Sequence, residues 1–403
     1  MGVKKKSSFV TMCMTAGAFI LYTVGSGFAS GNEVLQFYGS WGFPGIIIAL
    51  LCGVAVAAIY CVCLFYVGRM TNIERAADVY TYFGGKWLGG FLRIFVYVFI
   101  CGCYMLMFSG AGSLLEQQFG IPKWVGAVLL GVISLIVLLG GLKTVESVLG
   151  CAGIVILGYV FVFAVISIFN PGSGLDQAAA VEQAAETGKV WQANLFGMPP
   201  LSWIPGLSEL NNAPLEGALY AALCSVSGFP FYFTLGKRAR SGKEAVISGV
   251  VTAIAFYACV ACSLFVMVAN GNSLVNPVTD QMYDFPMVAA VNSIWPAGSW
   301  TYALIIFVGI FTTTVGYLWV INDLLFPGSQ GTLTSRGRIL VAVLLVIGIC
   351  LGGVIPFSAL INFMFPLSGV VGLILTACEV RKALMIRKDR AKHLEQAEME
   401  SQP

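Results

Sequence analysis

Long apolar stretches separated by short polar segments run along almost the whole chain. A membrane-spanning helix needs roughly 20 mostly apolar residues, and nearly charge-free runs such as 45–67 approach or exceed that length. The pattern predicts an all-α polytopic membrane protein with ten transmembrane helices. We place them at about 9–37, 43–67, 88–115, 124–141, 145–169, 215–236, 245–269, 300–325, 338–355 and 357–379.

The composition agrees with this interpretation. Apolar residues make up 58% of the chain and charged residues only 10%, whereas a soluble domain usually carries about a quarter charged residues. The basic residues form short clusters at the ends of apolar stretches. The expected partners are therefore the lipid bilayer and a small-molecule substrate rather than a nucleic acid, and the sequence leaves the oligomeric state open.

The basic residues also predict an orientation. Lys4, Lys5 and Lys6 precede an apolar stretch that continues to Tyr38, too long for the core of a signal peptide, so we interpret it as an uncleaved first helix. With the N-terminus inside, all of the 22 Lys and Arg residues except Lys123 and Lys189 fall at or near the inner side. Because cytoplasmic loops are enriched in these residues, we expect a cytoplasmic (inner) membrane protein with both termini cytoplasmic.

Ten spans divide the chain into two halves. Residues 1–169 form the first five-helix repeat and 215–380 the second, separated by an extracellular loop at 170–214 and followed by a cytoplasmic tail at 381–403. An odd number of spans per half gives the two halves inverted topology. A second outer segment, 270–299, is either a solvated loop or a hairpin lid over an outward vestibule.

The first helix of each half contains a helix-breaking sequence. Helix 1 carries Gly25-Ser26-Gly27-Phe28-Ala29-Ser30-Gly31, and helix 6 carries Ser227-Gly228-Phe229-Pro230. Each interior Gly costs about 1 kcal/mol relative to Ala, and Pro removes a backbone donor. One explanation is close helix packing through small residues. Because the two interruptions occupy corresponding positions, they favour instead a transporter's binding site, with helices 1 and 6 broken.

These features resemble the LeuT fold of the amino acid–polyamine–cation superfamily over residues 8–380, and the run from Gly25 to Glu33 resembles the bacterial YkvI family of permeases. The resemblance implies a secondary active transporter that works by alternating access. It also implies a sodium ion between helices 1 and 8, with ligands carried over by position. They are the carbonyls of Gly25, Phe28 and Gly309 and the hydroxyls of Thr312 and Thr313.

The coupling ion has alternatives. Some proton-coupled relatives place a Lys of helix 5 at the sodium position, but 145–169 contains no Lys or Arg here. Sodium-coupled symport is therefore favoured over proton-coupled or uncoupled transport, and no other cofactor is expected. The predicted ligands Thr312 and Thr313 also have a simpler explanation, because threonine hydroxyls in membrane helices often hydrogen-bond only to the backbone of their own helix.

The expected substrate is an amino acid or a related small carboxylated compound. Backbone N–H groups exposed at a helix break suit a carboxylate, and the residues that would bind or wall the substrate lie at the two breaks and on helix 3. They are Ser26, Gly27, Gly31, Tyr104, Ser227, Gly228, Phe229 and Phe231. Each aromatic residue among them also has a simple packing explanation.

Two carboxylates are candidates for function. Glu33 is the acid closest to the break in helix 1, and it would bind a substrate amine, relay a proton or face the outer vestibule. Asp323, at the inner end of helix 8, would close a cytoplasmic gate or remain an interfacial charge.

Other functions fit less well. The single His lies in the tail and the 12 Cys lie in predicted spans without a metal-binding pattern, so an enzyme is not expected. A channel is disfavoured by the internal repeat, whereas a transporter-like solute receptor stays open.

Overall fold

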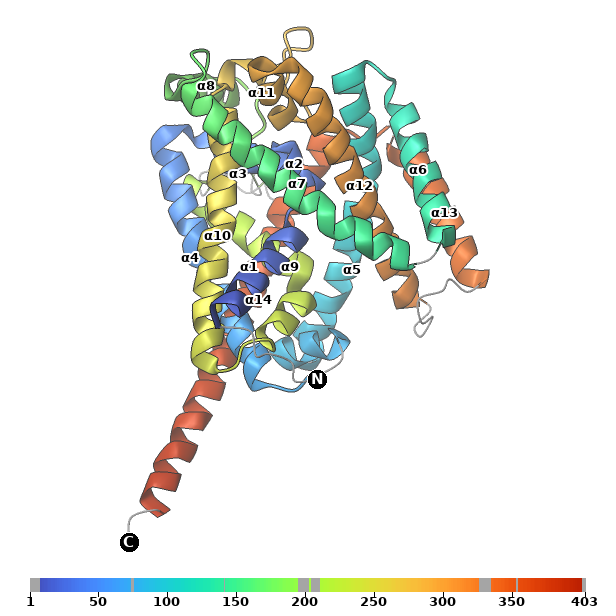
Figure 1. Cartoon of the computed structure of the whole chain (residues 1–403). Coiled ribbons are helices and arrows are strands. Elements are labelled where there is room, and N and C mark those ends of the chain that lie inside the picture. The colour runs from blue at the N-terminus through green and yellow to red at the C-terminus, as the bar shows by residue number, and fades with distance from the viewer. Residues whose placement is uncertain are drawn as a thin grey trace.

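A computed structural model gives the arrangement of the chain (Figure 1). It describes residues 8–73, 76–140, 142–194, 203, 211–325, 335–352 and 354–400. Within these ranges, the side chains are described except at residues 26, 76–77, 137–140, 142–153, 319–320, 322–325, 335 and 393–400.

The first half consists of one interrupted helix followed by long apolar helices. The elements are α1 (Ser8–Thr23), α2 (Ser26–Ser30), α3 (Asn32–Phe37), η1 (Gly39–Trp41), α4 (Gly42–Met70), α5 (Ala76–Phe119), α6 (Lys123–Gly140) and α7 (Leu142–Phe169). In α5 the backbone leaves helical geometry at Gly85, where φ is 71°. The predicted span 88–115 begins just after this kink.

The second half contains the remaining long helices and short surface elements. They are η2 (Leu175–Gln177), α8 (Ala178–Glu186), α9 (Ala213–Gly236), α10 (Gly242–Val268), η5 (Gly271–Ser273), α11 (Pro286–Ile294), α12 (Pro296–Leu325), α13 (Ser335–Gly352) and α14 (Phe357–Glu400). The polar segment 176–187 forms α8, so this part of the predicted outer loop is helical.

In the part of the chain that the structure describes, six helical segments are long and apolar enough to cross a membrane. They are Asn32–Met70, Asp78–Phe119, Ala213–Gly236, Gly242–Val268, Pro296–Leu318 and Phe357–Lys392. Ser8–Thr23, Lys123–Ile136 and Ile154–Phe169 are shorter apolar helices. The helical membrane-protein class is confirmed, and the count of ten spans stays a prediction.

The long helices pack as two groups. In one group, α1 and α4 each contact both α9 and α10; in the other, α5, α6, α12 and α13 all contact one another. Helix α14 packs on α4, α5 and α9, and α7 packs on α10 and α12. These two helices therefore join the groups on opposite sides of the interrupted helix (Figure 1).

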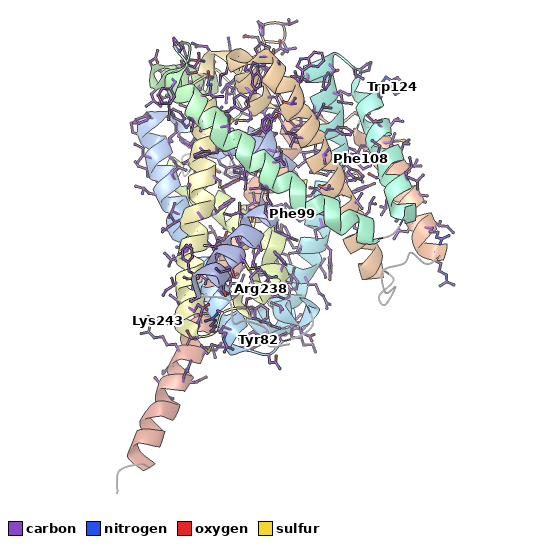
Figure 2. The ribbon with its side chains drawn as sticks, viewed as in Figure 1. Tyr82, Phe99, Phe108, Trp124, Arg238 and Lys243 are labelled. Carbon is purple, nitrogen blue, oxygen red and sulfur yellow. The ribbon has the colours of Figure 1, made fainter. Side chains whose placement is uncertain are left out.

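The molecule has two distinct ends along the direction of the long helices. Helices α8 and α11 lie at one end, which we call the distal end, and both chain termini lie at the other, the terminal end (Figure 1). Arg238 and Lys243 project at the terminal end, and Trp124 lies at the distal end of α6 (Figure 2). Helix α14 continues beyond the body of the protein at the terminal end (Figure 1).

Candidate functional site

The predicted interruption of the first span is present in the structure. Helix α1 ends at Thr23 and α2 begins at Ser26, so that Val24 and Gly25 link them in non-helical backbone. Gly31 separates α2 from α3 with a φ of +79°. A Cβ at Gly31 would lie 2.4 Å from Sδ of Met267. Both the left-handed backbone and the close neighbour therefore require glycine there.

The second predicted break is a kink rather than an unwound segment. Helix α9 runs from Ala213 to Gly236 with one non-helical residue, Gly228, at φ −121° and ψ 16°. Pro230 lies inside the helix and removes one helical hydrogen bond. The hydroxyl of Tyr22 donates to the nearby carbonyl of Ser227 at 3.3 Å. Helix α9 therefore consists of two helical segments joined across a kink at Gly228.

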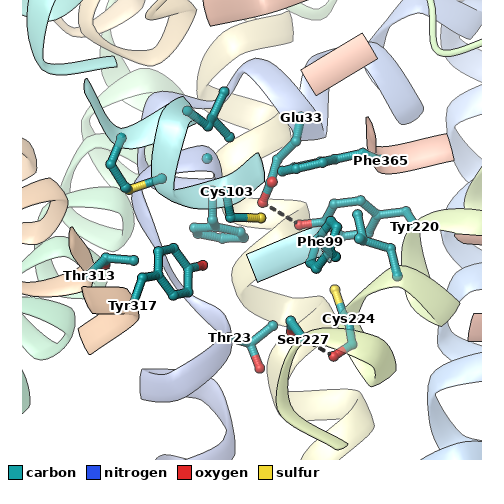
Figure 3. A pocket seen from close by; sticks show the side chains of 16 residues that line it. Thr23, Glu33, Phe99, Cys103, Tyr220, Cys224, Ser227, Thr313, Tyr317 and Phe365 are labelled. Carbon is teal, nitrogen blue, oxygen red and sulfur yellow. Dashed lines mark hydrogen bonds between the residues drawn. The ribbon is translucent and has the colours of Figure 1, made fainter. Parts of the chain in front are cut away.

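A cavity of about 80 Å³ lies beside the interruption of the first span (Figure 3). A single water needs only about 10–15 Å³ on this measure, so the cavity accommodates several waters or a small polar solute. Its lining comes from the α1–α3 region, α5, α9, α12 and α14. The lining residues are Thr23, Gly25, Gly27, Phe28, Glu33, Phe99, Cys103, Leu106, Met107, Tyr220, Leu223, Cys224, Ser227, Thr313, Tyr317 and Phe365.

The carboxylate of Glu33 forms part of the cavity wall. Glu33 lies in the first turn of α3 and is only 7% exposed. The hydroxyl of Tyr220 on α9 donates to its Oε1 at 3.0 Å (Figure 3). A Cβ at Gly27 would lie 2.5 Å from Oε2, so glycine at that position leaves room for the carboxylate. The geometry places Glu33 in the cavity rather than in an outer vestibule.

The rest of the lining is aromatic and weakly polar. Thr313 and Tyr317 of α12 lie across the cavity from Glu33 and Tyr220 (Figure 3). Phe28, Phe99 and Phe365 supply further aromatic surface. Among the residues that the structure describes, none of those lining the cavity is Lys or Arg. The carboxylate is thus surrounded by groups that do not neutralise its charge.

The expected sodium ligands are brought together only in part. Gly25, Phe28 and Thr313 line the cavity. The hydroxyls of Thr312 and Thr313 both donate to the carbonyl of Gly309, at 2.9 and 2.8 Å. A Cβ at Gly309 would meet a side chain of α7 at 3.2 Å, so this residue faces α7.

The backbone oxygens of the expected set also have partners within the chain. The carbonyl of Gly25 accepts from the N–H of Ala29, and that of Phe28 accepts from the N–H of Gly31, each at 3.0 Å. A carbonyl has two lone pairs, so both oxygens keep a free acceptor position.

Several predicted substrate residues lie outside the cavity lining. The hydroxyl of Tyr104 donates to the carbonyl of Leu344 on α13 at 2.7 Å. Phe231 stacks on Tyr22 with ring centroids 4.7 Å apart. Phe229 packs against Tyr80 and Phe83 of α5. Gly228 lies against Tyr22 and Tyr232, and Gly31 lies against Met267 and Met287. These residues shape the surroundings of the cavity rather than its wall.

Two predicted side chains cannot be placed. The side chains of Ser26 and Asp323 lie outside the described residues. The backbone of Ser26 begins α2, and that of Asp323 lies in the last turn of α12.

The segment 270–299 covers the distal side of the interrupted helix. Val275 and Met282 form an isolated antiparallel bridge, and α11 follows with Met287 and Val288 fully buried. A Cβ at Gly31 would lie 3.0 Å from Cβ of Met287. The part from 282 to 291 packs against the protein as a lid, whereas residues 277–281 are exposed.

Polar contacts hold this lid to four helices. The hydroxyl of Ser358 on α14 donates to Oδ1 of Asp284 at 2.7 Å, and Asn32 on α3 donates through Nδ2 to the carbonyl of Asp284 at 2.9 Å. Nζ of Lys123 on α6 lies 3.7 Å from Oδ2 of Asp284. Gln117 of α5 bonds both backbone groups of Phe285 at 2.9 Å. Asp284 and its neighbour thus connect the lid to α5 and α6 of one helix group, to α14 and to the interrupted helix.

Sequence reasoning missed several lining residues and two buried acids. Tyr220, Tyr317, Phe99 and Phe365 stand out neither by type nor by spacing among the 28 Phe and 15 Tyr residues of the chain. Glu216 and Glu379 are fully buried, and neither carboxylate has a hydrogen-bond partner within the described chain. Their position inside apolar spans was the available signal.

Comparison with known proteins confirms the YkvI resemblance. The chain is 25% identical to the membrane protein YkvI of Bacillus subtilis (strain 168) over 89% of this chain and 92% of that protein. It is 21% identical to YyaD of the same organism over 88% of this chain and 92% of that protein. No family model matches the chain.

Solved transporter structures match the chain at low similarity. MhsT in complex with L-phenylalanine has a TM-score of 0.49 and 12% identity, covering 96% of this chain and 89% of that one. A variant of the Eremococcus coleocola manganese transporter has a TM-score of 0.44 and 13% identity, covering 95% and 97%. A Na⁺-coupled sialic acid symporter has a TM-score of 0.40 and 13% identity, covering 94% and 98%.

Proposed function

We propose that this protein is a secondary active transporter for a small solute that carries a protonated amino group, an amino acid being the favoured class. The observation that carries the proposal is the buried Glu33 carboxylate on the wall of a cavity, beside a helix interruption within an apolar span. A buried carboxylate without a cationic partner is unfavourable. A solute ammonium would supply that partner, and the aromatic wall would favour it further.

The helix packing supports the proposed ten-span, LeuT-like inverted repeat. We pair α1–α3 with α9, α4 with α10, α5 with α12, α6 with α13 and α7 with α14. Under this exchange the contact between α1 and α10 corresponds to that between α9 and α4, and the contact between α5 and α6 corresponds to that between α12 and α13. In the same way, the contact of α14 with α4 corresponds to that of α7 with α10, and the contact of α14 with α5 corresponds to that of α7 with α12. Both members of each of these pairs are observed. A structure without internal symmetry has no reason to keep contacts under such an exchange.

The packed lid supports alternating access. Its contacts through Asp284 close the distal side of the cavity. Transport requires this lid to leave the cavity mouth in another state, with the two helix groups moving relative to each other. Secondary transporters built from repeats commonly use such motion.

We propose sodium as the coupling ion. Gly25, Phe28 and Thr313 line the same cavity, and they would offer two carbonyls and a hydroxyl to an ion bound there. These are the hard oxygen ligands that sodium prefers over sulfur or nitrogen. Rotation of the Thr313 hydroxyl away from Gly309 would free it for the ion.

For location, we propose the cytoplasmic membrane with the terminal end inside. The position of Arg238 and Lys243 at that end fits the positive-inside rule (Figure 2). A reporter that fluoresces only in the cytoplasm, fused after residue 403, should be active. A second reporter, which is active only outside the cytoplasm, should also be active when it is inserted after Gly188, just beyond the end of α8. The opposite pair of results would invert the orientation.

The decisive experiment measures ligand binding. Thermal unfolding of the purified protein is followed against a panel of amino acids, amines without a carboxylate, and carboxylates without an amine, in sodium and in choline. A bound ligand raises the apparent stability by mass action. We expect stabilisation only by amine-bearing solutes, and more in sodium. Stabilisation by carboxylates alone would overturn the proposed role of Glu33, and uptake into proteoliposomes then distinguishes a carrier from a receptor.

A further inference from the structure

A second hollow lies on the outer surface of the helix bundle, away from the cavity. It is a groove of about 730 Å³ between α4 and the terminal half of α14. Its lining residues are Ile59, Leu373, Thr376, Ala377, Val380, Arg381, Leu384, Met385 and Lys388. None of these residues lines the cavity described above.

The groove is apolar over most of its length. Leu384 is 57% exposed, and Met385 and Ile59 are each 45% exposed. The lining residues of α14 extend from Leu373 to Lys388, which corresponds to a length of roughly 22 Å along the helix at 1.5 Å per residue. One leaflet of a bilayer has a hydrocarbon thickness of about 15 Å. The groove is therefore long enough for an acyl chain and the headgroup attached to it.

Two cations occupy the terminal part of this groove. Arg381 and Lys388 are seven residues apart, so they lie on one face of α14, and both are exposed. Within the described chain, neither forms an ion pair with a carboxylate. Other basic residues of α14 contact the protein: Nζ of Lys382 lies 4.6 Å from the ring centre of Tyr82, and Arg390 reaches Sδ of Met70.

We propose that this groove binds an anionic phospholipid, with an acyl chain along Leu373–Leu384 and the phosphate between Arg381 and Lys388. A soluble anion would gain nothing from the apolar wall, and a neutral lipid would leave both cations without a counter-charge. Basic pockets between membrane helices bind anionic headgroups for these reasons. The inference is independent of the transport function.

The site is connected to the cavity through one helix. Phe365 of α14 lines the cavity and Leu373 begins the groove, eight residues further along the same helix. A lipid in the groove therefore contacts the helix that forms one wall of the solute site.

Native mass spectrometry of the purified full chain tests the proposal, with phosphatidylglycerol and phosphatidylcholine as probes. We expect retention of phosphatidylglycerol over phosphatidylcholine. Since each basic residue near the surface contributes about 1 kcal/mol, Arg381→Gln with Lys388→Gln should lower phosphatidylglycerol affinity by roughly tenfold or more. The matched control, Arg387→Gln with Arg390→Gln, removes the same charge outside the groove and should have a much smaller effect.

A third variant tests the acyl chain. Ala377→Phe fills the groove without changing charge, so it should lower retention of phosphatidylglycerol as well. An unchanged affinity in this variant would mean that the cations bind a headgroup without a groove, which would overturn the proposal. Equal losses of phosphatidylglycerol affinity in the two double variants would also overturn the proposal, because they would show that the lipid is attracted by the overall charge of the helix and not by the groove. Thermal unfolding of each variant without added lipid reports whether it is folded.

Discussion

Glu33 is the residue on which the proposed solute site depends. Its carboxylate accepts one hydrogen bond from Tyr220 and lies in a cavity with aromatic walls. In such surroundings a charge interacts more strongly than in water, and its partner must come from the same cavity. The solute or a coupling cation is the natural source of that partner.

Glu33→Gln should weaken binding of the amine-bearing solute. The change keeps the shape and removes the charge, and a hydrogen bond to a charged group is worth about 1.5–3 kcal/mol. We therefore expect the dissociation constant to rise by roughly 10- to 100-fold, measured by titration calorimetry or thermal shift. Glu186→Gln, the same change on the exposed α8, should leave it unaltered. An unchanged dissociation constant in Glu33→Gln would refute the ammonium contact.

Thr313→Val should remove most of the sodium dependence of solute binding. Valine keeps the volume of the side chain and deletes the hydroxyl of a residue that lines the cavity. Losing one oxygen ligand should raise the sodium concentration for half-maximal effect by roughly five- to tenfold, on the scale of one hydrogen bond. Thr314→Val is the matched control, because Thr314 is not among the residues that line the cavity. Equal behaviour of the two variants would disprove the ion site.

At the residue scale, sequence reasoning identified only part of the site. Gly27, Phe28, Glu33, Ser227 and Thr313 line the cavity as expected. The acid and the glycines were visible because they are rare or unfavourable inside apolar helices. Tyr104 and Tyr317 look alike in sequence, and only the rotation of each helix decides which one faces the cavity.

At the scale of elements, the two interruptions differ although their sequences look alike. The first contains three glycines, and its backbone takes a non-helical course at Gly25 and a left-handed one at Gly31. The second contains one glycine and a proline, and there the helix only bends. Counting breakers predicted where each helix is disturbed. It did not predict how strongly each helix is distorted, because the distortion depends on which neighbouring groups replace the lost backbone hydrogen bonds.

Gly31→Ala should destabilise the protein. A left-handed backbone costs an L-residue roughly 1–2 kcal/mol, and the new methyl would also lie 2.4 Å from Sδ of Met267. The midpoint of thermal unfolding in detergent should fall. Gly17→Ala is the control, because no atom lies within 4 Å of its added Cβ and the residue is inside α1. A midpoint for Gly31→Ala equal to that of the wild type would contradict the described backbone.

At the scale of the whole molecule, the lid connects helices that lie far apart along the chain. Asp284 contacts α3, α6 and α14. The sequence left this segment open between a solvated loop and a hairpin lid. The partners across the fold could not be predicted, because Ser358 and Lys123 are far away in the chain and unremarkable by type.

Asp284→Ala should loosen the distal closure. The substitution removes the side-chain contacts to Ser358 and Lys123 together, so opening of the lid becomes more favourable. Amide hydrogen exchange should become faster in α11 and in α2 and α3. Asp280→Ala removes a surface ion pair, with Lys189 at 2.8 Å, and should change only its own surroundings. Unchanged exchange in α11 of Asp284→Ala would show that the lid is held by its apolar contacts alone.

Helix α14 has a mechanical consequence for the molecule. Pro366 lies inside it, next to Phe365 on the cavity wall, and a proline is a natural pivot in a helix. From that point to Glu400 the helix would extend about 50 Å if straight. A tilt of roughly 10° at the pivot would then move the far end by about 9 Å. We therefore expect small rearrangements around a bound solute to displace the far end of α14 by distances large enough to measure.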